Sequence, residues 1–268
     1  MKNKIRGEFI LKFLIVGDVC GRPGREAFRK YVPELKKEHN IDIVVVNGEN
    51  IAGGRGISRK TLDEIYRAGA DIVTSGNHIW DQKEIVSFID DEPFLIRPAN
   101  YPEGAPGKGY CIYPFKAKNI GVINVSGRTF MPPMDCPFQK VDEILKEIKN
   151  QCDIILVDIH AEATSEKIAM GFYLDGKVTC VVGTHTHVQT ADNRILPKGT
   201  AYVSDLGMVG PYNSSLGINV NNAIDKFITC RPVRFEMAEG PNIFSAVVLE
   251  LAEDNSVKSF ERILFNEE

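Results

Sequence analysis

The stretch Phe13-Leu14-Ile15-Val16-Gly17-Asp18-Val19-Cys20-Gly21-Arg22-Pro23-Gly24 places a short apolar run directly before a polar, glycine-rich loop. An apolar run of this length bounded by turn residues is typical of a buried strand. The apolar residues that recur over residues 25–38 predict an amphipathic helix after the loop. This order of strand, loop and helix is the repeating unit on which the prediction of the fold rests.

The same order recurs twice further along the chain. A β-branched strand at residues 41–46 stops at Asn47-Gly48-Glu49-Asn50, and Ser58 is the expected N-cap of a helix that ends near Ala68. A strand at residues 71–74 is followed by Ser75-Gly76-Asn77-His78 and by an expected helix over residues 82–89. Consecutive units of this kind predict a parallel α/β sheet whose polar loops gather at one edge.

The rest of the chain continues the α/β pattern. Further strands are expected at residues 120–125, 154–157, 178–182 and 200–203, and helices at residues 140–149 and 163–172. Together with the strand at 200–203, final strands near residues 245–251 and 259–264 are expected to complete a second sheet. The Pro/Gly-rich stretch 97–107 is expected to be a loop, of the kind that often forms part of the rim of an enzyme site.

Composition limits the class of protein. The 268 residues are 43% hydrophobic and 25% charged and contain no linker-like segment, so a single domain over residues 1–268 is expected. The net charge of -4 argues against stable nucleic-acid binding through phosphate neutralisation. A small anionic substrate held by metal ions remains compatible with this charge.

The cysteines and the start of the chain favour the cytoplasm. The six cysteines are widely spread without a CxxC pair, which favours a reducing compartment. The basic start, Met1 to Leu11, leads into an apolar run that Lys12 interrupts and that is too short for a signal peptide. No run approaches the roughly 18 apolar residues of a membrane helix, so no membrane association is expected.

Four of the five histidines stand where a strand pattern gives way to a loop. The exception is His39, which lies in a charged stretch and is interpreted as part of a solvated helix end. His185 and His187 follow a short apolar run at i and i+2, so both imidazoles can reach one point beyond the end of the strand. Histidine is the most common metal ligand among side chains, and this pair indicates a metal site.

The polar residues at the predicted strand ends form a set with a specific chemistry. The set comprises Asp18, Glu49, Asn50, Asn77, His78, His160, His185 and His187. Two carboxylates, two amides and three or four imidazoles are about what two divalent metals with one bridging carboxylate require. A set without thiolate suits Mn, Fe, Zn or Ni better than a structural zinc. Cys20 is the nearby thiol, and whether it contacts metal stays open.

A dinucleotide-binding loop is the alternative interpretation of the first glycine-rich segment. Gly17, Gly21 and Gly24 have the spacing GxxxGxxG rather than GxGxxG. Pro23 also removes a backbone N–H beside the expected phosphate position. The sequence therefore disfavours this alternative.

The motifs resemble those of the calcineurin-like metallophosphoesterases. That superfamily has an Asp-x-His after the first strand, a bridging aspartate, Gly-Asn-His, a lone histidine and Gly-His-x-His. The matching positions here are Gly17-Asp18-Val19, Gly48-Glu49-Asn50, Gly76-Asn77-His78, His160 and Gly183-Thr184-His185-Thr186-His187. Cys20 replaces the first histidine, and Glu49 replaces the aspartate. These departures, with residues 160–167 and 189–197, resemble the YmdB-like bacterial phosphodiesterases from about Lys12 to the C-terminus.

The resemblance implies a fold, ligands and a substrate class. The fold would be an α-β-β-α sandwich of two mixed sheets flanked by helices. One metal would be held by Asp18, Glu49, Asn50 and His187, and the other by Glu49, Asn77, His160 and His185. His78 would face the substrate, and iron or manganese would be favoured over zinc or nickel. The subfamily indicates a small phosphoester, specifically a 2′,3′- or 3′,5′-cyclic nucleotide.

The residues themselves are compatible with that chemistry. Two metals ~3.5–4 Å apart can activate a bridging hydroxide for in-line attack on phosphorus, and an imidazole such as His78 can protonate the leaving oxygen. The alternatives are a nucleotide-binding or scaffold signalling protein with incidental hydrolysis, and a hydrolase of another ester or amide. A homo-oligomer is compatible with the sequence. Whether Arg97 and Arg128 contact phosphate stays open.

Overall fold

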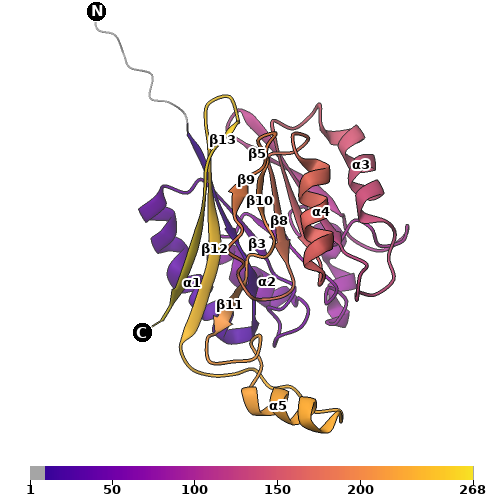
Figure 1. Cartoon of the computed structure of the whole chain (residues 1–268), viewed down its shortest axis with the longest axis vertical. Helices are drawn as coiled ribbons and strands as arrows, with labels where there is room; N and C mark the ends of the chain where they lie inside the picture. Colours follow the sequence, from indigo (N-terminus) through magenta and orange to yellow (C-terminus); the bar gives the residue numbers. More distant parts are fainter. Residues whose placement is uncertain (1–9, 268) are drawn as a thin grey trace, which may run out of the picture.

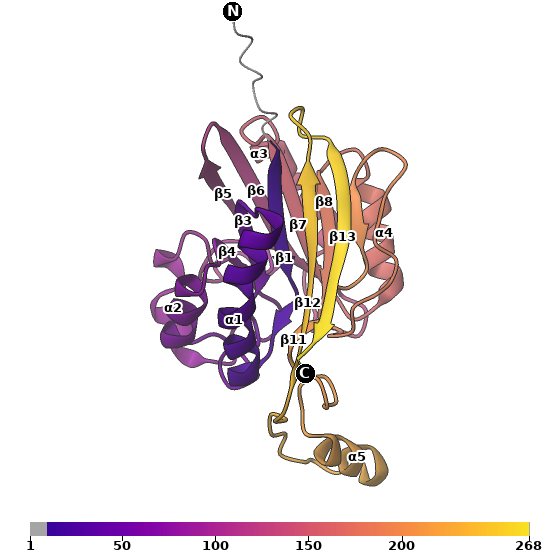
Figure 2. The same cartoon turned by 90° about the vertical axis from the view of Figure 1, so that its left-hand side faces the viewer.

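Two β-sheets pack face to face, and helices cover both outer faces (Figure 1). The computed structural model describes residues 10–267, and the basic start of the chain at residues 1–9 lies outside them. Figure 2 shows the two sheets edge on, with α1 and α2 on one side and α4 on the other. This arrangement confirms the α-β-β-α sandwich implied by the family resemblance.

The first sheet has seven strands, and it contains the strand of each of the three predicted strand–loop–helix units. Its order is β2 (Asp18–Val19), β11 (Met208–Pro211), β12 (Asn242–Leu251), β1 (Leu11–Val16), β3 (Ile43–Asn47) and β4 (Ile72–Thr74), with β13 (Val257–Asn266) paired to β12. The strands β1, β3 and β4 are parallel, as predicted. Because β12 runs antiparallel to β1, the sheet as a whole is mixed.

The second sheet has six strands. Its order is β5 (Tyr110–Phe115), β6 (Lys118–Ser126), β7 (Ile154–His160), β8 (Cys180–Thr184), β10 (Ala201–Val203) and β9 (Arg194–Ile195). The central strands β6, β7, β8 and β10 are parallel, and the edge strands β5 and β9 are antiparallel to their neighbours. The carboxyl ends of the central strands therefore meet at one edge of this sheet.

The prediction for the final two strands was wrong in its choice of sheet. The strand at residues 200–203 does join the second sheet as β10, but β12 and β13 lie in the first sheet. Val247 and Leu249 of β12 face the core between the sheets, whereas Ala246 and Val248 face the helical side. A strand that is apolar on both faces fits the centre of a covered sheet, and only long-range contacts decide which sheet that is.

Helices cover each sheet on its outer face. The five α-helices of residues 10–267 are α1 (Gly21–His39) and α2 (Arg59–Arg67) on the first sheet, α3 (Pro137–Ile148) and α4 (Thr164–Leu174) on the second, and α5 (Val220–Thr229). Ser58 caps α2 as predicted, since its hydroxyl accepts a hydrogen bond from the Thr61 N–H at 3.2 Å. Among residues 10–267, no helix combines the length and apolar character needed to cross a bilayer.

Alternation along β1 builds two layers of core at once. Phe13 and Ile15 point between the sheets, whereas Leu14 and Val16 belong to the core layer that also contains Phe28 of α1. Successive side chains of a strand project to opposite faces, so an uninterrupted apolar run is what a strand covered on both faces requires. This packing fixes β1 in place and leaves the residues after Val16 at the edge of the sheet.

Helix α1 begins earlier than predicted. It starts at Gly21 rather than at Arg25, so the stretch that the sequence indicated as loop forms the first helical turn. Pro23 is tolerated there because the first N–H groups of a helix have no partner within it. At the other end, His39 is the last residue of the helix and is partly exposed, as predicted.

The predicted helix over residues 82–89 was also wrong. The segment forms two short 3-10 helices, η1 (Lys83–Ser87) and η2 (Ile89–Asp91). The Ser87 hydroxyl donates to the Glu84 carbonyl at 2.7 Å, which competes with the backbone bonds of an α-helix. Pro93 then follows closely and limits any continuation.

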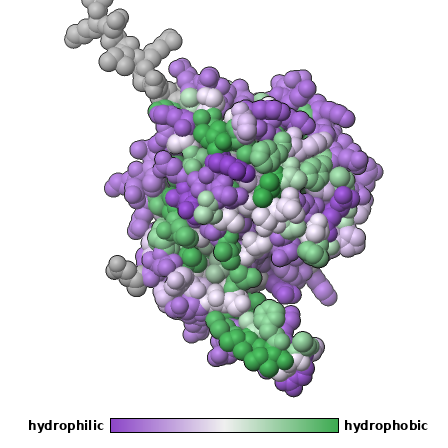
Figure 3. All heavy atoms as spheres, in the orientation of Figure 1, coloured by the Kyte–Doolittle hydropathy of each residue, from purple (hydrophilic) through white to green (hydrophobic). Residues whose placement is uncertain are grey.

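The segment 212–240 projects from one end of the molecule and carries α5 (Figure 2). Ala223 is the single buried residue of α5. Phe227 is 80% exposed and Ile228 is 77% exposed. The projecting end is accordingly green in the hydropathy view (Figure 3).

Candidate metal centre

The predicted ligands gather where the carboxyl ends of parallel strands from both sheets meet. The first sheet supplies Asp18 after β1 and the Glu49 loop after β3, and the second sheet supplies His160 as the last residue of β7. The His185 and His187 side chains follow β8. The fold thus brings to one place residues that are far apart in the chain, as the strand pattern predicted.

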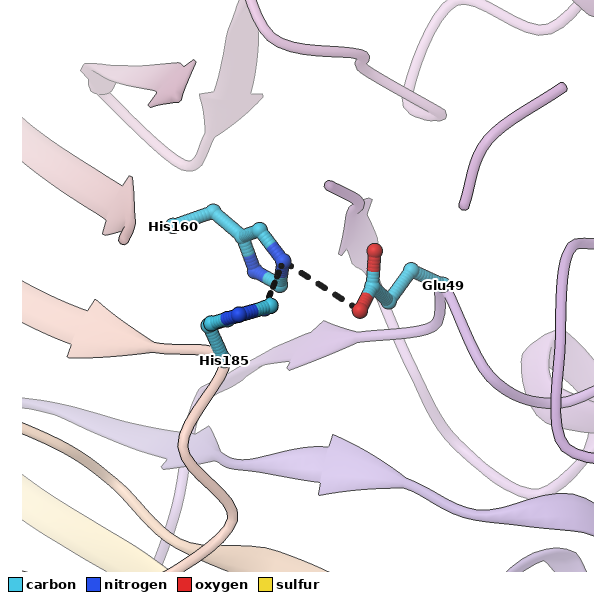
Figure 4. Close-up of side chains that lie close together, drawn as sticks. All are labelled: Glu49, His160 and His185. Atoms are coloured by element: carbon cyan, nitrogen blue, oxygen red, sulfur yellow. Dashed lines mark hydrogen bonds and ion pairs between the residues drawn. The ribbon is translucent and has the colours of Figure 1, made fainter. Parts of the chain in front are cut away.

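Glu49, His160 and His185 form the first group of possible ligands (Figure 4). His160 Nε2 lies 3.2 Å from Glu49 Oε1 and 3.0 Å from His185 Nδ1. One ligand atom from each residue lies within 4.8 Å of the others. A single cation placed among these atoms could contact all three residues.

A second group shares Glu49 with the first. It comprises Asp18, Glu49 and His187, again with ligand atoms within 4.8 Å of one another. Asp18 Oδ2 accepts a hydrogen bond from the His185 N–H at 3.2 Å, but Asp18 Oδ1 is buried and has no hydrogen-bond partner. A buried carboxylate oxygen without a partner is costly unless a cation binds it. The shared Glu49 is placed where a bridging ligand would be needed.

The two asparagines lie beside these groups in different ways. Asn77 Oδ1 lies 3.0 Å from His160 Nε2, so an amide oxygen already faces the first group. Asn50 instead directs its amide nitrogen toward Glu49 Oε1 and His187 Nε2, at 3.1 and 3.2 Å. Because cations bind the oxygen of an amide, Asn50 could serve as a ligand after a half-turn of its side-chain amide.

Burial perturbs the protonation of the centre. Burial raises the pKa of Asp18 to about 7, although His187 and His160 oppose that shift. Burial and the charge of His160 lower the pKa of His185 to about 3. Burial also acts on Glu49, but its ion pair with His160 outweighs this effect and holds the Glu49 pKa well below its usual value. Several ionisable groups therefore share a water-poor space, as is common at functional sites.

The centre fits divalent cations on three grounds. The donors are carboxylate oxygen, amide oxygen and imidazole nitrogen, a combination suited to first-row divalent metals. Asp18 Oδ1 is buried without a hydrogen-bond partner, with His187 Nε2 3.8 Å away, so a cation between the two atoms could bind both. Gly76 leaves the space clear, since a Cβ there would lie 2.3 Å from the His160 ring and 2.4 Å from Glu49 Oε2.

A buried ion pair braces the turn that carries the last two histidines. His185 and His187 have φ values of 100° and 63°, in a region that non-glycine residues rarely adopt. Asp205 accepts hydrogen bonds from the Thr186 N–H at 3.0 Å and from its hydroxyl at 2.7 Å. Lys167 Nζ lies 2.7 Å from the same carboxylate, and both charged groups are buried. This pair holds the turn in its strained conformation.

A second buried carboxylate orients His160. The Thr184 hydroxyl donates to Asp158 Oδ1 at 2.8 Å and can accept from His160 Nδ1 at 3.0 Å. This arrangement keeps a proton on Nδ1, so Nε2 is the ring nitrogen that faces Glu49 and would bind a metal. Such an outer hydrogen bond usually fixes the tautomer of a metal-binding histidine.

His78 lies at the open side of the centre. Its backbone N–H donates to Glu49 Oε2 at 3.0 Å, and its Nδ1 lies 2.9 Å from Asp81 Oδ2. The contact with Asp81 leaves Nε2 as the ring nitrogen available to a substrate. His78 lines a cavity of about 280 Å³ together with Glu49, Asn50, His185 and His187.

The cavity also contains residues that the sequence analysis did not single out. Arg55 comes from the glycine-rich loop after β3 and lines the cavity as an exposed side chain. Glu162 Oε2 lies 3.2 Å from His185 Nε2. The sequence analysis also did not single out Asp205 and Lys167, which lie behind the turn at Thr186 and are not among the residues that line the cavity. Glu162 follows His160 by two residues, so its position after a strand end was the available signal.

The three residues left open by the sequence differ in position. Cys20 lines the cavity, with its Sγ 3.6 Å from His187 Nδ1. The Arg97 guanidinium donates to carbonyls of its own loop, those of Pro98, Ala105 and Pro106. Arg128 is exposed and is not among the residues that line the cavity.

The fold and the buried carboxylate–imidazole cluster define the class of metallophosphoesterases. The family model for YmdB-like proteins matches residues 14–263. The chain is 51% identical to the 2′,3′-cyclic-nucleotide 2′-phosphodiesterase of Bacillus subtilis over 260 residues, which cover 96% of this chain and 98% of the relative. The chain belongs to the YmdB-like family, and it is an enzyme of the phosphodiesterase class, a hydrolase of phosphoric esters.

Solved structures agree with this assignment. A phosphatase from Mycoplasma pneumoniae superposes with a TM-score of 0.92 at 34% identity, covering 97% of this chain and 95% of that chain. A protein of Thermus thermophilus superposes with a TM-score of 0.91 at 40% identity, covering 96% of this chain and 100% of that chain. The sandwich fold is therefore shared with these two proteins over nearly their whole length.

Proposed function

We propose that this enzyme hydrolyses 2′,3′-cyclic nucleotides to nucleoside 3′-phosphates with two divalent metal ions, iron or manganese. The observation that carries the proposal is the pair of ligand groups that share Glu49, with a buried oxygen on Asp18 that has no hydrogen-bond partner. The substrate is inferred from the name of the Bacillus subtilis relative. A 3′,5′-cyclic nucleotide has no such support and serves as the comparison substrate.

The residues would divide between two metal sites. One site would use Asp18, Glu49, Asn50 and His187, and the other would use Glu49, Asn77, His160 and His185. When bound, two divalent ions would neutralise the phosphoryl oxygens and lower the pKa of water at the site. The buried pairs behind the centre would keep these ligands in place during turnover.

The chain's own residues would then position the substrate and supply a proton. Water would add to phosphorus and release a proton to solvent, from which His78 is later reprotonated; the bond from phosphorus to O2′ would break, and the phosphate would stay on O3′. His78 would protonate the leaving O2′ from Nε2, while Asp81 holds Nδ1 and so fixes the orientation of the ring. Arg55 at the rim of the cavity would attract the anionic substrate.

A metal and product analysis tests this proposal. Elemental analysis of the purified protein should find close to two metal ions per chain, and chelation should abolish hydrolysis until Mn or Fe is restored. With adenosine 2′,3′-cyclic phosphate the product should be the 3′-monophosphate, and the 3′,5′-cyclic isomer should react far more slowly. The proposal would be contradicted if the purified protein held no metal and stayed inactive after Mn or Fe was added. It would also be contradicted if the active enzyme formed only the 2′-monophosphate.

A further inference from the structure

One wall of the catalytic cavity is apolar and comes from a single segment. Leu216, Ile218 and Met237, all from residues 212–240, line the same cavity as Glu49 and His187. The other residues that line the cavity are mostly polar or charged, and they include the carboxylates of Glu49 and Glu162 and three imidazoles. The cavity therefore offers both charged groups and apolar side chains to a ligand.

This wall is held firmly against the metal centre. The Leu216 carbonyl lies 3.1 Å from His187 Nδ1, so the backbone of the segment is tied to a predicted ligand. The backbones of Ile218 and Met237 pair as an antiparallel bridge, which places their residues side by side. Met237 packs against the glycine-rich loop, where a Cβ at Gly54 would lie 2.6 Å from its sulfur. The apolar wall therefore has a fixed position relative to the ligands.

We propose that Leu216, Ile218 and Met237 receive the base of the nucleotide and set a preference for nucleotides over cyclic phosphates that lack a base. This inference rests on the proposed function of the same site. A cyclic nucleotide has an anionic phosphate at one end and a flat, largely apolar base at the other. Leucine and methionine side chains pack well against such a ring. The two ends of the ligand thus match the two parts of the cavity.

The chemistry of the wall also predicts which differences between bases it ignores. Its three side chains carry no N–H or O–H group and no strong acceptor, so they contribute apolar contact rather than hydrogen-bond recognition. We therefore expect adenosine, guanosine, cytidine and uridine 2′,3′-cyclic phosphates to react with similar kcat/KM. The purines should be modestly favoured because their larger rings cover more of the wall.

The test compares two substrates that differ only in the base. Values of kcat/KM are measured for adenosine 2′,3′-cyclic phosphate and for ribose 2′,3′-cyclic phosphate, and their ratio is the preference for the base. The native enzyme should favour the nucleotide, and Leu216→Ala should lower the preference roughly tenfold, mainly through KM. Met237→Ala should act in the same direction, and Met237→Leu should restore the preference.

Ile224→Ala is the matched control. Ile224 is 48% exposed, against 49% for Leu216, and it lies on the same projecting segment but does not line the cavity. Its replacement should leave the preference at the native value. The Leu216→Ala variant should keep the native melting temperature and metal content, because an exposed side chain is lost and the carbonyl beside His187 remains.

Different outcomes separate the inference from the proposed function. A native enzyme that hydrolyses both substrates equally, or a Leu216→Ala variant that keeps the native preference, would overturn the role of the wall while the proposed function stands. Metal-loaded, folded enzyme that hydrolyses neither substrate but cleaves bis-p-nitrophenyl phosphate would overturn the proposed substrate. The inference would fall with it.

Discussion

The metal centre and the projecting segment 212–240 meet at one cavity but are built in opposite ways. The possible ligands Asp18, Glu49 and His160 are buried at the ends of sheet strands, and further buried pairs support them. The segment 212–240 leaves most of α5 exposed. The comparison indicates that the sheets supply the candidate ligands, whereas the preference for a base that we propose would come from a separate segment.

Loss of the shared carboxylate is expected to have the largest effect. Glu49→Gln keeps the shape of the side chain but removes the charge that both ligand groups share. Metal content measured by elemental analysis should fall by at least half, and hydrolysis should fall roughly 10³-fold or more. Glu64→Gln, which alters a carboxylate paired with Arg25, is the control and should keep its metal. Native metal content in Glu49→Gln would refute the shared-ligand proposal.

Loss of the proposed acid should separate catalysis from metal binding. His78→Ala should lower kcat by about 10²–10⁴-fold on a cyclic nucleotide while metal content stays native. The loss should be much smaller with bis-p-nitrophenyl phosphate, because p-nitrophenolate leaves without a proton. Asp81→Asn should reduce kcat less than His78→Ala does. An equal loss on both substrates would show that His78 does not act as the acid.

Loss of the buried cation should destabilise the histidine turn. Lys167→Met leaves the Asp205 carboxylate buried without its ion-pair partner, so the free energy of unfolding should fall by about 3 kcal/mol. Metal affinity should also decrease, because the turn carries His185 and His187. Lys177→Met removes an exposed lysine near the end of the same helix and should change stability by ~0.5 kcal/mol or less. Denaturant unfolding with and without metal would measure both effects, and equal stability of the two variants would exclude the brace.

A change in the exposed face of α5 should have the smallest effect. Phe227→Ser should alter the free energy of unfolding by ~0.5 kcal/mol or less, because the side chain is 80% exposed. Phe28→Ala in the buried face of α1 is the contrasting variant and should cost about 3–5 kcal/mol. Thermal unfolding of both proteins would make the comparison. A large loss of stability in Phe227→Ser would contradict this expectation and would mean that the Phe227 side chain is buried in solution.

Local features of the sequence were sufficient for the strands that position the site. The runs before Asp18 and Glu49 are apolar and end in polar turns, and both became strands of the first sheet at the predicted places. Such signals act over a few residues, because alternation and turn chemistry are local. The prediction of a helix over residues 82–89 was wrong for an equally local reason, because the Ser87 hydroxyl donates to a carbonyl that an α-helix would use.

The support behind the ligands could not be predicted from the sequence. Lys167 looks like a surface lysine of a helix, and its partner Asp205 is 38 residues away. Nothing in either local pattern indicates that both groups are buried or that they brace the turn at Thr186. The apolar wall was missed for the same reason, since Leu216 and Met237 become neighbours only through the fold.

The sequence by itself determined which chemical groups are available and that they follow strand ends. Residue type and short-range periodicity depend only on residues that are close in the sequence. The tertiary structure decided which sheet received β12, how Glu49 came to be shared by two ligand groups, and which buried pairs hold the histidine turn. These outcomes depend on contacts between residues that are distant in the sequence. A buried charge without a partner costs free energy, so the charged groups that the fold buries are found in pairs.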